Sequence, residues 1–237
     1  MPARVIPARR TGPLDREIEA LLEPALRANR LSISLGSEIL PGPDLEKLRQ
    51  SVDAVLVCTG VWREQTLGGR GNGVLGGLEF LESFKSGERT SVPDRVAVLA
   101  GGDCAMESAR LSRESGASQV YVVFSGERSA LHWHMPESWF ATPGVHAMME
   151  WEPLRYERGP QGELRGLHIR HATLGTSALL EIDMVIEAMG LEPDPRWDLQ
   201  NAGISFAGGI LNGGTSVASC LAEGRAAAAK IHADFFP

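Results

Sequence analysis

The order of apolar and polar positions along the chain predicts an α/β protein. Residues 53–60, DAVLVCTG, form a nearly continuous apolar run that ends in glycine, which is typical of a strand buried in a parallel sheet. Residues 31–36 alternate like a short strand, and residues 11–30 repeat apolar side chains at helical spacing. Residues 44–51 and 74–87 predict a short helix and a connecting helix. The first part of the chain therefore predicts a fragment of an α/β unit.

The middle of the chain predicts a complete strand–helix–strand unit. Residues 95–102, RVAVLAGG, indicate a strand with a glycine turn, and residues 104–117 a helix that ends at Gly116. Residues 118–126 indicate the next strand. The length and order are those of the βαβ unit of nucleotide-binding folds.

The second half of the chain completes the middle unit and then returns to the outer unit. Residues 145–175 predict short strands, with a hairpin turn at 158–164. Residues 181–195 predict another buried strand, and residues 206–236 a glycine-rich turn followed by one long alanine-rich helix. We therefore expect a nucleotide-type α/β domain inserted into an outer α/β domain.

Composition and charge narrow the class of function. The net charge of −7 argues against a broad nucleic-acid-binding surface. No apolar run approaches the roughly 20 residues that cross a bilayer, so no membrane span is expected. The three cysteines are far apart and form no CxxC pair, which excludes a cysteine-ligated cluster within this chain and fits a reducing cytoplasm. Two histidine pairs, at 132/134 and 168/171, lack nearby acids or cysteines, and no metal site is expected.

Residues 96–110, VAVLAGGDCAMESAR, predict a strand, a glycine turn and a helix start. Such a turn lets a dinucleotide pyrophosphate approach the backbone, and the helix supplies N–H groups and the positive end of its dipole. The register is A-x-G-x-x-A, with Ala100 in place of the usual first glycine. A positive φ at Ala100 costs about 1 kcal/mol or more. Two interpretations of this stretch remain open, a weakened nucleotide site and a Rossmann-like unit that binds nothing. The candidate pyrophosphate-binding residues are Gly101, Gly102, Asp103, Cys104 and Ala105.

Ribose recognition is expected just after the second strand of the unit, in the sequence FSGERS. Glu127 suits the 2′-hydroxyl of NAD, Arg128 suits the 2′-phosphate of NADP, and Ser125 serves either. A solvated loop is the alternative, and the pattern leaves the choice of nucleotide open.

The glycine-rich turn before the last helix is a second candidate anion site. Thr215 lies at the helix start, where it either contacts an anion or only caps the helix. The remaining candidate cofactor-binding residues at strand and turn ends are Gly190, Gly209 and Asn212.

Four stretches together resemble the small subunit of glutamate synthase and related flavin–NADPH electron-transfer modules, including part of dihydropyrimidine dehydrogenase. They are VIPARRTGPLDREIEALL, DAVLVCTGVWREQTLGGRGNGVLGGLEFL, VAVLAGGDCAMESARLSRESGASQVYVV, and IDMVIEAMGLEPDP with FAGGILNGGTSVASCLAEGRAAAAKI. The resemblance runs in order over nearly the whole chain. It implies a Rossmann-like NAD(P)-binding domain at 91–199, inserted into a truncated FAD-type α/β domain made of 1–90 and 200–237.

Departures from the family pattern lie at the cofactor sites. The chain starts after the cysteine-rich segment and the first FAD-binding strand and loop of the family. Ile210 follows the last glycine pair where the family has an aspartate. Asp103 replaces an asparagine, Glu107 an aspartate, and Ser125 with Gly126 an arginine pair. The resemblance therefore implies an incomplete FAD site in this chain.

Two functions follow. The first is an NAD(P)H-dependent oxidoreductase subunit of the glutamate synthase small-subunit type, which passes hydride to a flavin held mostly outside this chain. Hydride transfer between cofactors depends on positioning, so no catalytic residue is named. The second is a non-catalytic scaffold or nucleotide-sensing relative. Uncovered sheet edges and apolar faces at 21–26 and 53–60 predict a homo-oligomer or a larger oxidoreductase partner subunit.

Overall fold

The computed structural model describes most of the chain. The described residues are 20, 22–24, 27–28, 30–32, 34, 36–99, 102–130, 137–201, 203–213 and 217–235. Most of the helix expected at 11–30 and the turn residues 100 and 101 lie outside them.

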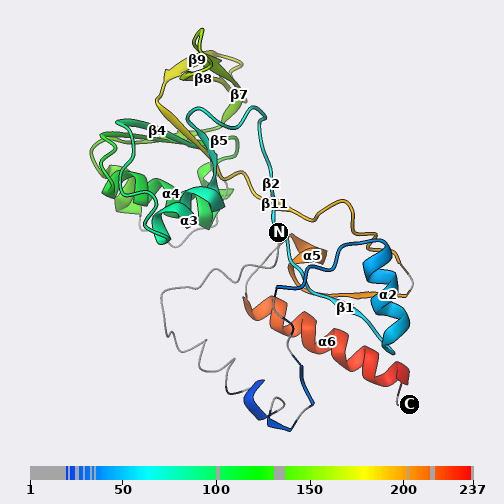
Figure 1. The fold of residues 1–237 in the computed structure, drawn as a ribbon. Coiled ribbons are helices and arrows are strands. Elements are labelled where there is room, and N and C mark those ends of the chain that lie inside the picture. Colours follow the sequence, from blue (N-terminus) through cyan, green and yellow to red (C-terminus); the bar gives the residue numbers. More distant parts are fainter. Residues whose placement is uncertain are drawn as a thin grey trace. The chain divides into compact units, whose positions relative to one another are not determined.

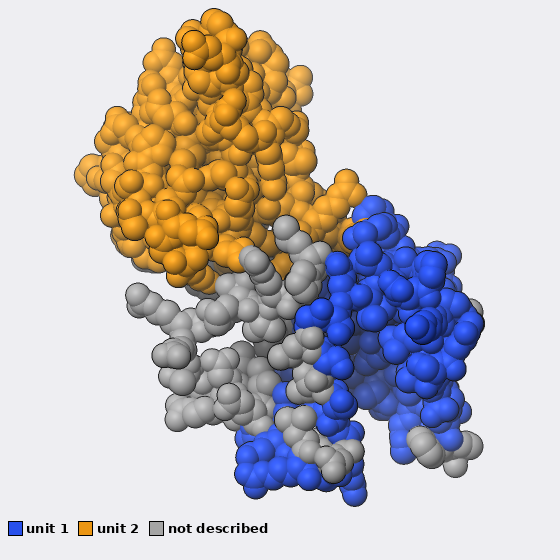
Figure 2. Space-filling model, viewed as in Figure 1, with its two compact units in different colours: residues 1–60, 195–237 blue, residues 61–194 orange. Residues whose placement is uncertain are grey.

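The chain divides into two compact units (Figure 2). Unit 1 combines residues 1–60 with 195–237, and unit 2 is residues 61–194. Along the sequence, unit 2 lies between the two parts of unit 1. Residues 61–90, expected in the outer domain, belong to unit 2.

Unit 2 is built on a five-stranded parallel sheet (Figure 1). Across the sheet the strands are β3 (Val74–Gly76), β10 (Met184–Glu187), β4 (Arg95–Leu99), β5 (Gln119–Phe124) and β6 (Val145–Met149). The apolar runs predicted as strands at 95–102, 118–126 and 181–195 contain β4, β5 and β10. Residues 74–76, predicted as the start of the helix at 74–87, are instead the strand β3, which pairs with β10. All four residues of β10 are buried, as are the last four of β4.

Two helices cover one face of this sheet, α3 (Gly77–Lys85) and α4 (Asp103–Glu114). Phe80 of α3 and Met106 of α4 pack with strand side chains in one buried cluster. The chain turns after α4 at Gly116, whose φ of +116° favours glycine. The predicted strand–helix–strand unit is therefore β4, α4 and β5.

A three-stranded antiparallel sheet covers the other face. Its strands are β7 (Trp151–Arg158), β8 (Leu164–His171) and β9 (Ser177–Glu181). Leu167 and Ile169 pack against Val185 of the parallel sheet in a second buried cluster. The turn between β7 and β8 is the hairpin predicted at 158–164. Unit 2 therefore has three layers, helices, parallel sheet and antiparallel sheet.

The segments that enter and leave unit 2 pair with each other. They form the antiparallel strands β2 (Arg63–Glu64) and β11 (Leu191–Glu192). Arg63 and Glu192 form an ion pair across them at 2.9 Å. Two short 3₁₀ helices, η1 (Arg128–Ala130) and η2 (Glu137–Ala141), lie between β5 and β6.

Unit 1 contains one parallel pair of strands, β1 (Leu56–Val57) and β12 (Ser205–Phe206). Its helices are α2 (Pro43–Ser51), α5 (Gly209–Asn212) and α6 (Val217–Phe235). The helices predicted at 44–51 and at the end of the chain are confirmed. None of the helices among the described residues combines the length and the hydropathy needed to cross a membrane.

Two strand predictions in unit 1 need correction. Only Leu56–Val57 of the run 53–60 is a strand, and Leu56 is 36% exposed. The run is not buried on both faces, because Val55 and Val57 pack into the small core of unit 1 while Leu56 between them is exposed. The described residues of 31–36 lie in no strand. Alternation over so few positions specifies no partner strand, and strands are stable only when paired.

Candidate functional site

The carboxyl ends of β4 and β10 meet at the point where the connections of the parallel sheet change direction. The chain runs from β4 to β5 and β6 on one side, and β10 and β3 lie on the other side. Leu99 and Glu187 are register partners, and the N–H of Ala188 donates to the carbonyl of Leu99 at 3.1 Å. Ligands of open α/β sheets bind at such a switch point.

The N-terminus of α4 opens onto this edge of the sheet. Gly102 is its N-cap residue, with extended backbone at φ −162°, and no side chain caps the helix. A Cβ built on Gly102 would meet no atom within 4 Å, so the space beside it is open. Open space, uncapped N–H groups and the positive end of a helix dipole together favour an anion.

Four of the predicted pyrophosphate-binding residues lie together at this helix start, Gly102, Asp103, Cys104 and Ala105. Ala105 is fully buried between helix and sheet, as expected for the position of a third glycine. Gly101 and the substituted turn position Ala100 lie outside the described residues.

Two acidic residues of α4 differ in their surroundings. Asp103 is exposed in the first turn of α4. There its carboxylate interacts favourably with the positive end of the helix dipole but repels a phosphate. Glu107, one turn later, pairs with Arg110 at 2.6 Å. This hydrogen bond lowers the pKa of Glu107, so its charge is compensated within the helix.

Cys104 is a packing residue in this structure. A Cβ on Gly77 of α3 would lie 2.8 Å from its Sγ, so the two helices approach closely there. Burial, followed by the negative charge of Glu64, raises the pKa of the Cys104 thiol to about 11. The thiol is therefore protonated at neutral pH and does not act as a nucleophile.

The expected ribose-binding residues follow β5. Ser125 and Glu127 are exposed, and Glu127 accepts a hydrogen bond from Ser129 at 3.3 Å. The guanidinium carbon of Arg128 lies 5.0 Å from the ring centroid of Phe140 in η2. Arg128 is thus oriented by a cation–π contact and is not only a solvated charge.

A buried carboxylate at the same edge of the sheet was not predicted from the sequence. Glu187, the last residue of β10, is 0% exposed. It accepts hydrogen bonds from the Thr66 hydroxyl at 2.8 Å, the Leu67 N–H at 2.8 Å and Arg70 Nε at 2.7 Å. The Tyr156 hydroxyl of β7 also donates to it. The available signal was a charge that closes a buried apolar strand at its carboxyl end.

The hydrogen-bond donors around Glu187 lower the pKa of this carboxylate, and the cluster extends to α3. Burial alone would raise the pKa of Glu187, but the donors, Tyr156 and Arg70 first, outweigh burial and lower it. Burial and the Glu187 charge raise the pKa of Tyr156. Arg70 also bonds Glu64, and Glu64 accepts the N–H of Leu78 at 2.8 Å. The cluster thus joins the entering segment, β10, β7 and the first turn of α3.

The other candidate residues do not belong to α4. Gly190, with φ +120°, follows β10, and its carbonyl accepts the N–H of Gln65 between the paired entering and leaving segments. Gly209 and Asn212 belong to α5 of unit 1. Thr215 lies outside the described residues.

The glycine turn of unit 1 is occupied by groups of the chain itself. Gly208 has φ +76°, and its N–H donates to the carboxylate of Glu223 on α6 at 2.8 Å. Ile210 is fully buried in the small core of unit 1. A carboxylate therefore holds the N–H that a phosphate would need, and an apolar side chain replaces the expected polar one.

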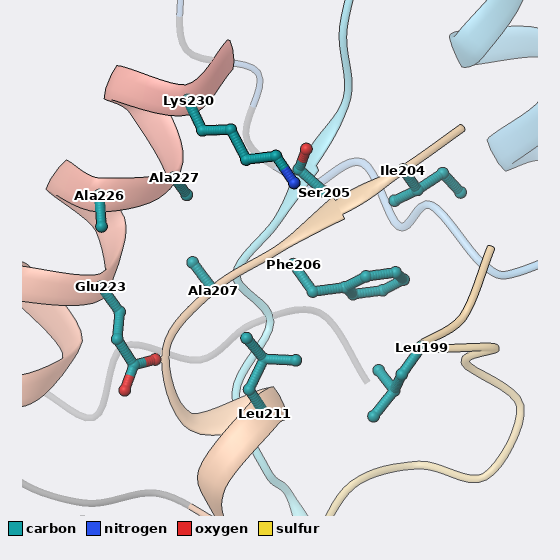
Figure 3. A pocket seen from close by; sticks show the side chains of 10 residues that line it. All are labelled: Leu199, Ile204, Ser205, Phe206, Ala207, Leu211, Glu223, Ala226, Ala227 and Lys230. Carbon is teal, nitrogen blue, oxygen red and sulfur yellow. The ribbon is translucent and has the colours of Figure 1, made fainter. Parts of the chain in front are cut away.

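An open groove of about 450 Å³ runs between β12 and α6 (Figure 3). Its walls are mostly apolar, and Lys230 and Glu223 are its charged residues. The lining residues are Leu199, Ile204, Ser205, Phe206, Ala207, Leu211, Glu223, Ala226, Ala227 and Lys230. Leu199 and Leu211 are exposed.

The histidines with described positions serve other contacts. His168 bonds Glu157 at 2.7 Å, and His171 packs edge-on against Trp151. His132 and His134 lie outside the described residues. Within the part of the chain that the structure describes, no three His, Cys, Asp or Glu side chains form a group able to hold a metal ion.

Comparison with known proteins gives a family match and several relatives. Residues 8–216 match the model of a family described as pyridine nucleotide-disulphide oxidoreductase. The glutamate synthase [NADPH] small chain of Azospirillum brasilense is 25% identical over 80% of this chain and 50% of its own length. The NADP(+)-dependent formate dehydrogenase subunit beta of Moorella thermoacetica is 26% identical over 92% of this chain and 37% of its own length. The chain thus spans half or less of the length of these relatives.

Solved structures show the same fold at low identity. The thioredoxin reductase of T. acidophilum superposes with a TM-score of 0.58 and 18% identity, over 78% of this chain and 66% of that one. The enzyme of Lactococcus lactis gives 0.59 and 14%, over 76% and 65%. At these identities the likeness concerns the fold alone, and it confirms the Rossmann-type α/β architecture.

Proposed function

Because the chain belongs to the pyridine nucleotide-disulphide oxidoreductase family, we propose that it is the nucleotide-binding subunit of an NAD(P)H-dependent oxidoreductase. The observation that carries the proposal is the uncapped start of α4 at the switch point of a parallel sheet. The proposed nucleotide is NADPH in the first place, since the relatives are named for NADPH and NADP(+).

The residues of unit 2 fit a dinucleotide. The first N–H groups of α4 would hold the pyrophosphate beside Gly102, where no side chain intervenes. Ser125 and Arg128 follow the neighbouring strand, where the ribose and a 2′-phosphate are recognised in this fold class. A bound nicotinamide supplies a hydride. The chain's own part is to bind and orient, which needs no acid or base among these residues.

The described residues of unit 1 do not fit a flavin. The N–H of Gly208 is bonded by Glu223, and Ile210 lies in the core. We therefore place the flavin that accepts the hydride mostly outside this chain. We propose that the nucleotide domain expected at 91–199 is centred on unit 2, and that the flavin-type remnant expected at 1–90 and 200–237 is centred on unit 1.

A partner subunit is part of the proposal. The relatives are named as a small chain and a subunit beta. In unit 1, β1 has β12 as its strand neighbour, and the groove beside β12 exposes Leu199 and Leu211. An open edge and an apolar groove favour association. Sedimentation of the purified chain tests this, because a monodisperse monomer with little dye-accessible apolar surface contradicts it.

The function is tested by mixing the full chain anaerobically with NADPH and an excess of free FAD, which stands in for the partner's flavin. We expect faster loss of the visible flavin absorption with the chain than without it. The matched variants are Gly102→Val, which fills the open space beside α4, and Gly224→Ala, which adds a methyl group with no neighbour within 4 Å. The first loses the effect and the second keeps it.

The second candidate is a non-catalytic nucleotide sensor or scaffold. The occupied turn of unit 1, with Glu223 on Gly208 and Ile210 in the core, favours it. Saturable NADPH binding by the chain, together with flavin reduction no faster than in buffer, decides for this candidate and against the first.

A further inference from the structure

The three cysteines of the chain are free thiols in different surroundings. Cys104 belongs to α4 of unit 2, and its side chain packs against α3. Cys58 and Cys220 both lie in unit 1, although they are far apart in sequence. Cys58 follows β1 and Cys220 belongs to α6, and both lie beside the turn that follows β12.

Strand register places Cys58 beside the turn. In the parallel pair, Leu56 lies opposite Ser205 and Val57 opposite Phe206. Cys58 follows β1 directly and therefore lies opposite Ala207, at the spacing of neighbouring strands, about 4.8 Å. Its side chain is exposed.

Two contacts place Cys220 against the next residue of this turn, Gly208. The carboxylate of Glu223 accepts the N–H of Gly208 at 2.8 Å, which fixes this face of α6 on the turn. Cys220 is three residues before Glu223 and shares that helix face. A Cβ on Gly208 would lie 3.9 Å from both Cβ and Sγ of Cys220.

The two thiols are also coupled electrostatically. Burial raises the pKa of the Cys58 thiol, the N–H of Ala207 opposes this, and the charge of Cys220 raises the pKa further. Ala207 thus lies next to Cys58 by strand register, and Cys220 is near enough for its charge to act on Cys58. Gly208, which lies beside Cys220, has no side chain that would fill the space next to this thiol.

We propose that Cys58 and Cys220 form a reversible intramolecular disulfide that ties the carboxyl end of β1 to α6. The oxidant is a small-molecule disulfide. The Cys58 thiolate attacks one sulfur of it and releases one thiol, which takes up the proton that Cys58 lost. The Cys220 thiolate then attacks the sulfur of Cys58 and releases the second thiol, which takes up the proton of Cys220. Two electrons pass from the cysteine pair to the small disulfide.

This inference is independent of the proposed nucleotide site, because both cysteines belong to unit 1. The bond would hold α6 on the glycine turn, next to the groove that exposes Leu211. It would also close a loop that contains the whole of unit 2, which constrains the unfolded chain.

The test exposes the purified full chain to oxidised glutathione, blocks remaining thiols by alkylation and maps the peptides by mass spectrometry. We expect a linked peptide pair containing Cys58 and Cys220, with Cys104 alkylated, and loss of the link on addition of reduced glutathione. Glutathione that stays on Cys58 without a linked pair overturns the proposal. So do unreacted thiols or disulfide-linked dimers.

Three serine variants control the assignment. In Cys220→Ser the second step is blocked, so glutathione accumulates on Cys58. In Cys58→Ser no link forms, and in Cys104→Ser the link forms as in the parent chain. Circular dichroism of each variant verifies folding. A linked peptide pair in Cys58→Ser or Cys220→Ser must contain Cys104, and it also overturns the proposal.

Discussion

The carboxylate of Glu187 holds three elements of unit 2 together. It is fully buried at the end of β10 and bonds Thr66, Arg70 and Tyr156. A buried charge is tolerated only when its hydrogen bonds are satisfied and a counter-charge is near, and both conditions are met here. Its position beside Leu99 places this cluster at the same edge of the sheet as the start of α4.

We expect Glu187→Gln to destabilise unit 2 by about 3 kcal/mol, because it leaves Arg70 without its buried partner. Urea unfolding measures the change. The matched control is Glu181→Gln, whose parent side chain is 77% exposed and pairs with Arg95 at the surface. It should change stability by less than about 0.5 kcal/mol. Equal effects of the two variants would show that the Glu187 cluster contributes nothing specific.

The same cluster predicts a pH dependence. The folded state holds the pKa of Glu187 below its usual value, so the unfolded state takes up its proton first as the pH falls. The stabilisation is therefore complete above the unfolded pKa of about 4.5 and is lost as the pH falls through the lower, folded pKa. The stability difference between the parent chain and Glu187→Gln should shrink in acid and stay constant from about pH 6 to 8. A difference that grows in acid contradicts this sign.

Asp103 predicts a gain of function by removal of charge. Its carboxylate lies in the first turn of α4, where the phosphates of a dinucleotide would bind. We expect Asp103→Asn to tighten NADPH binding about three- to tenfold at low salt, and less at high salt, because like charges no longer repel. Calorimetry at two ionic strengths measures it. Unchanged affinity at both would place the phosphates away from this turn.

At the scale of elements, the close approach of α3 and α4 depends on a missing side chain. A Cβ on Gly77 would lie 2.8 Å from Cys104 Sγ and 2.9 Å from Ala188 Cβ. We expect Gly77→Ala to cost about 1–3 kcal/mol by overpacking, measured by thermal or urea unfolding. Cys104→Ala in the same chain should recover part of that cost, since the two sites are in contact. Strict additivity of the two changes would contradict this packing.

In unit 2, β4, α4 and β5 were predictable because each carries its own local signal, whereas β3 was predicted as the start of a helix. The apolar run of β4, the helical spacing of α4 and the glycine after it specify a strand, a helix and its end without tertiary information. In unit 1 the run 53–60 predicts a longer strand than β1, because burial on both faces depends on what packs against each face of the sheet. A local apolar pattern does not contain that information.

The candidate site was predictable only in part. The residues of the glycine turn that the structure describes lie at the start of α4, as a motif with fixed spacing requires. Glu187 was missed because its partners, Thr66, Arg70 and Tyr156, come from segments far away in sequence. Likewise, the hydrogen bond from Gly208 to Glu223 joins a turn to a helix and leaves no trace in either segment alone.

At the scale of the whole molecule, the two units differ in the size of their cores. Unit 2 has two buried clusters, one on each face of the parallel sheet. Among the described residues, the buried cluster of unit 1 is Leu45, Val55, Val57 and Ile210. Since stability follows buried apolar surface, unit 1 should open at a lower free energy than unit 2.

Amide hydrogen exchange measures this difference. We expect the slowest exchange in β4, β5 and β10, and exchange in β1 and β12 that is faster by about tenfold or more. Addition of a partner subunit that covers unit 1 should slow β1 and β12 selectively. Uniform protection across both units would show one cooperative core and contradict the division.

Binding of a nicotinamide nucleotide at the start of α4 is measured by calorimetric titration of the folded full chain with NADPH and, separately, with NADH. We expect saturable binding of NADPH that weakens about tenfold or more in Gly102→Val and is unchanged in Gly224→Ala. No binding of either nucleotide by the folded chain, or equal binding by Gly102→Val, would contradict this prediction.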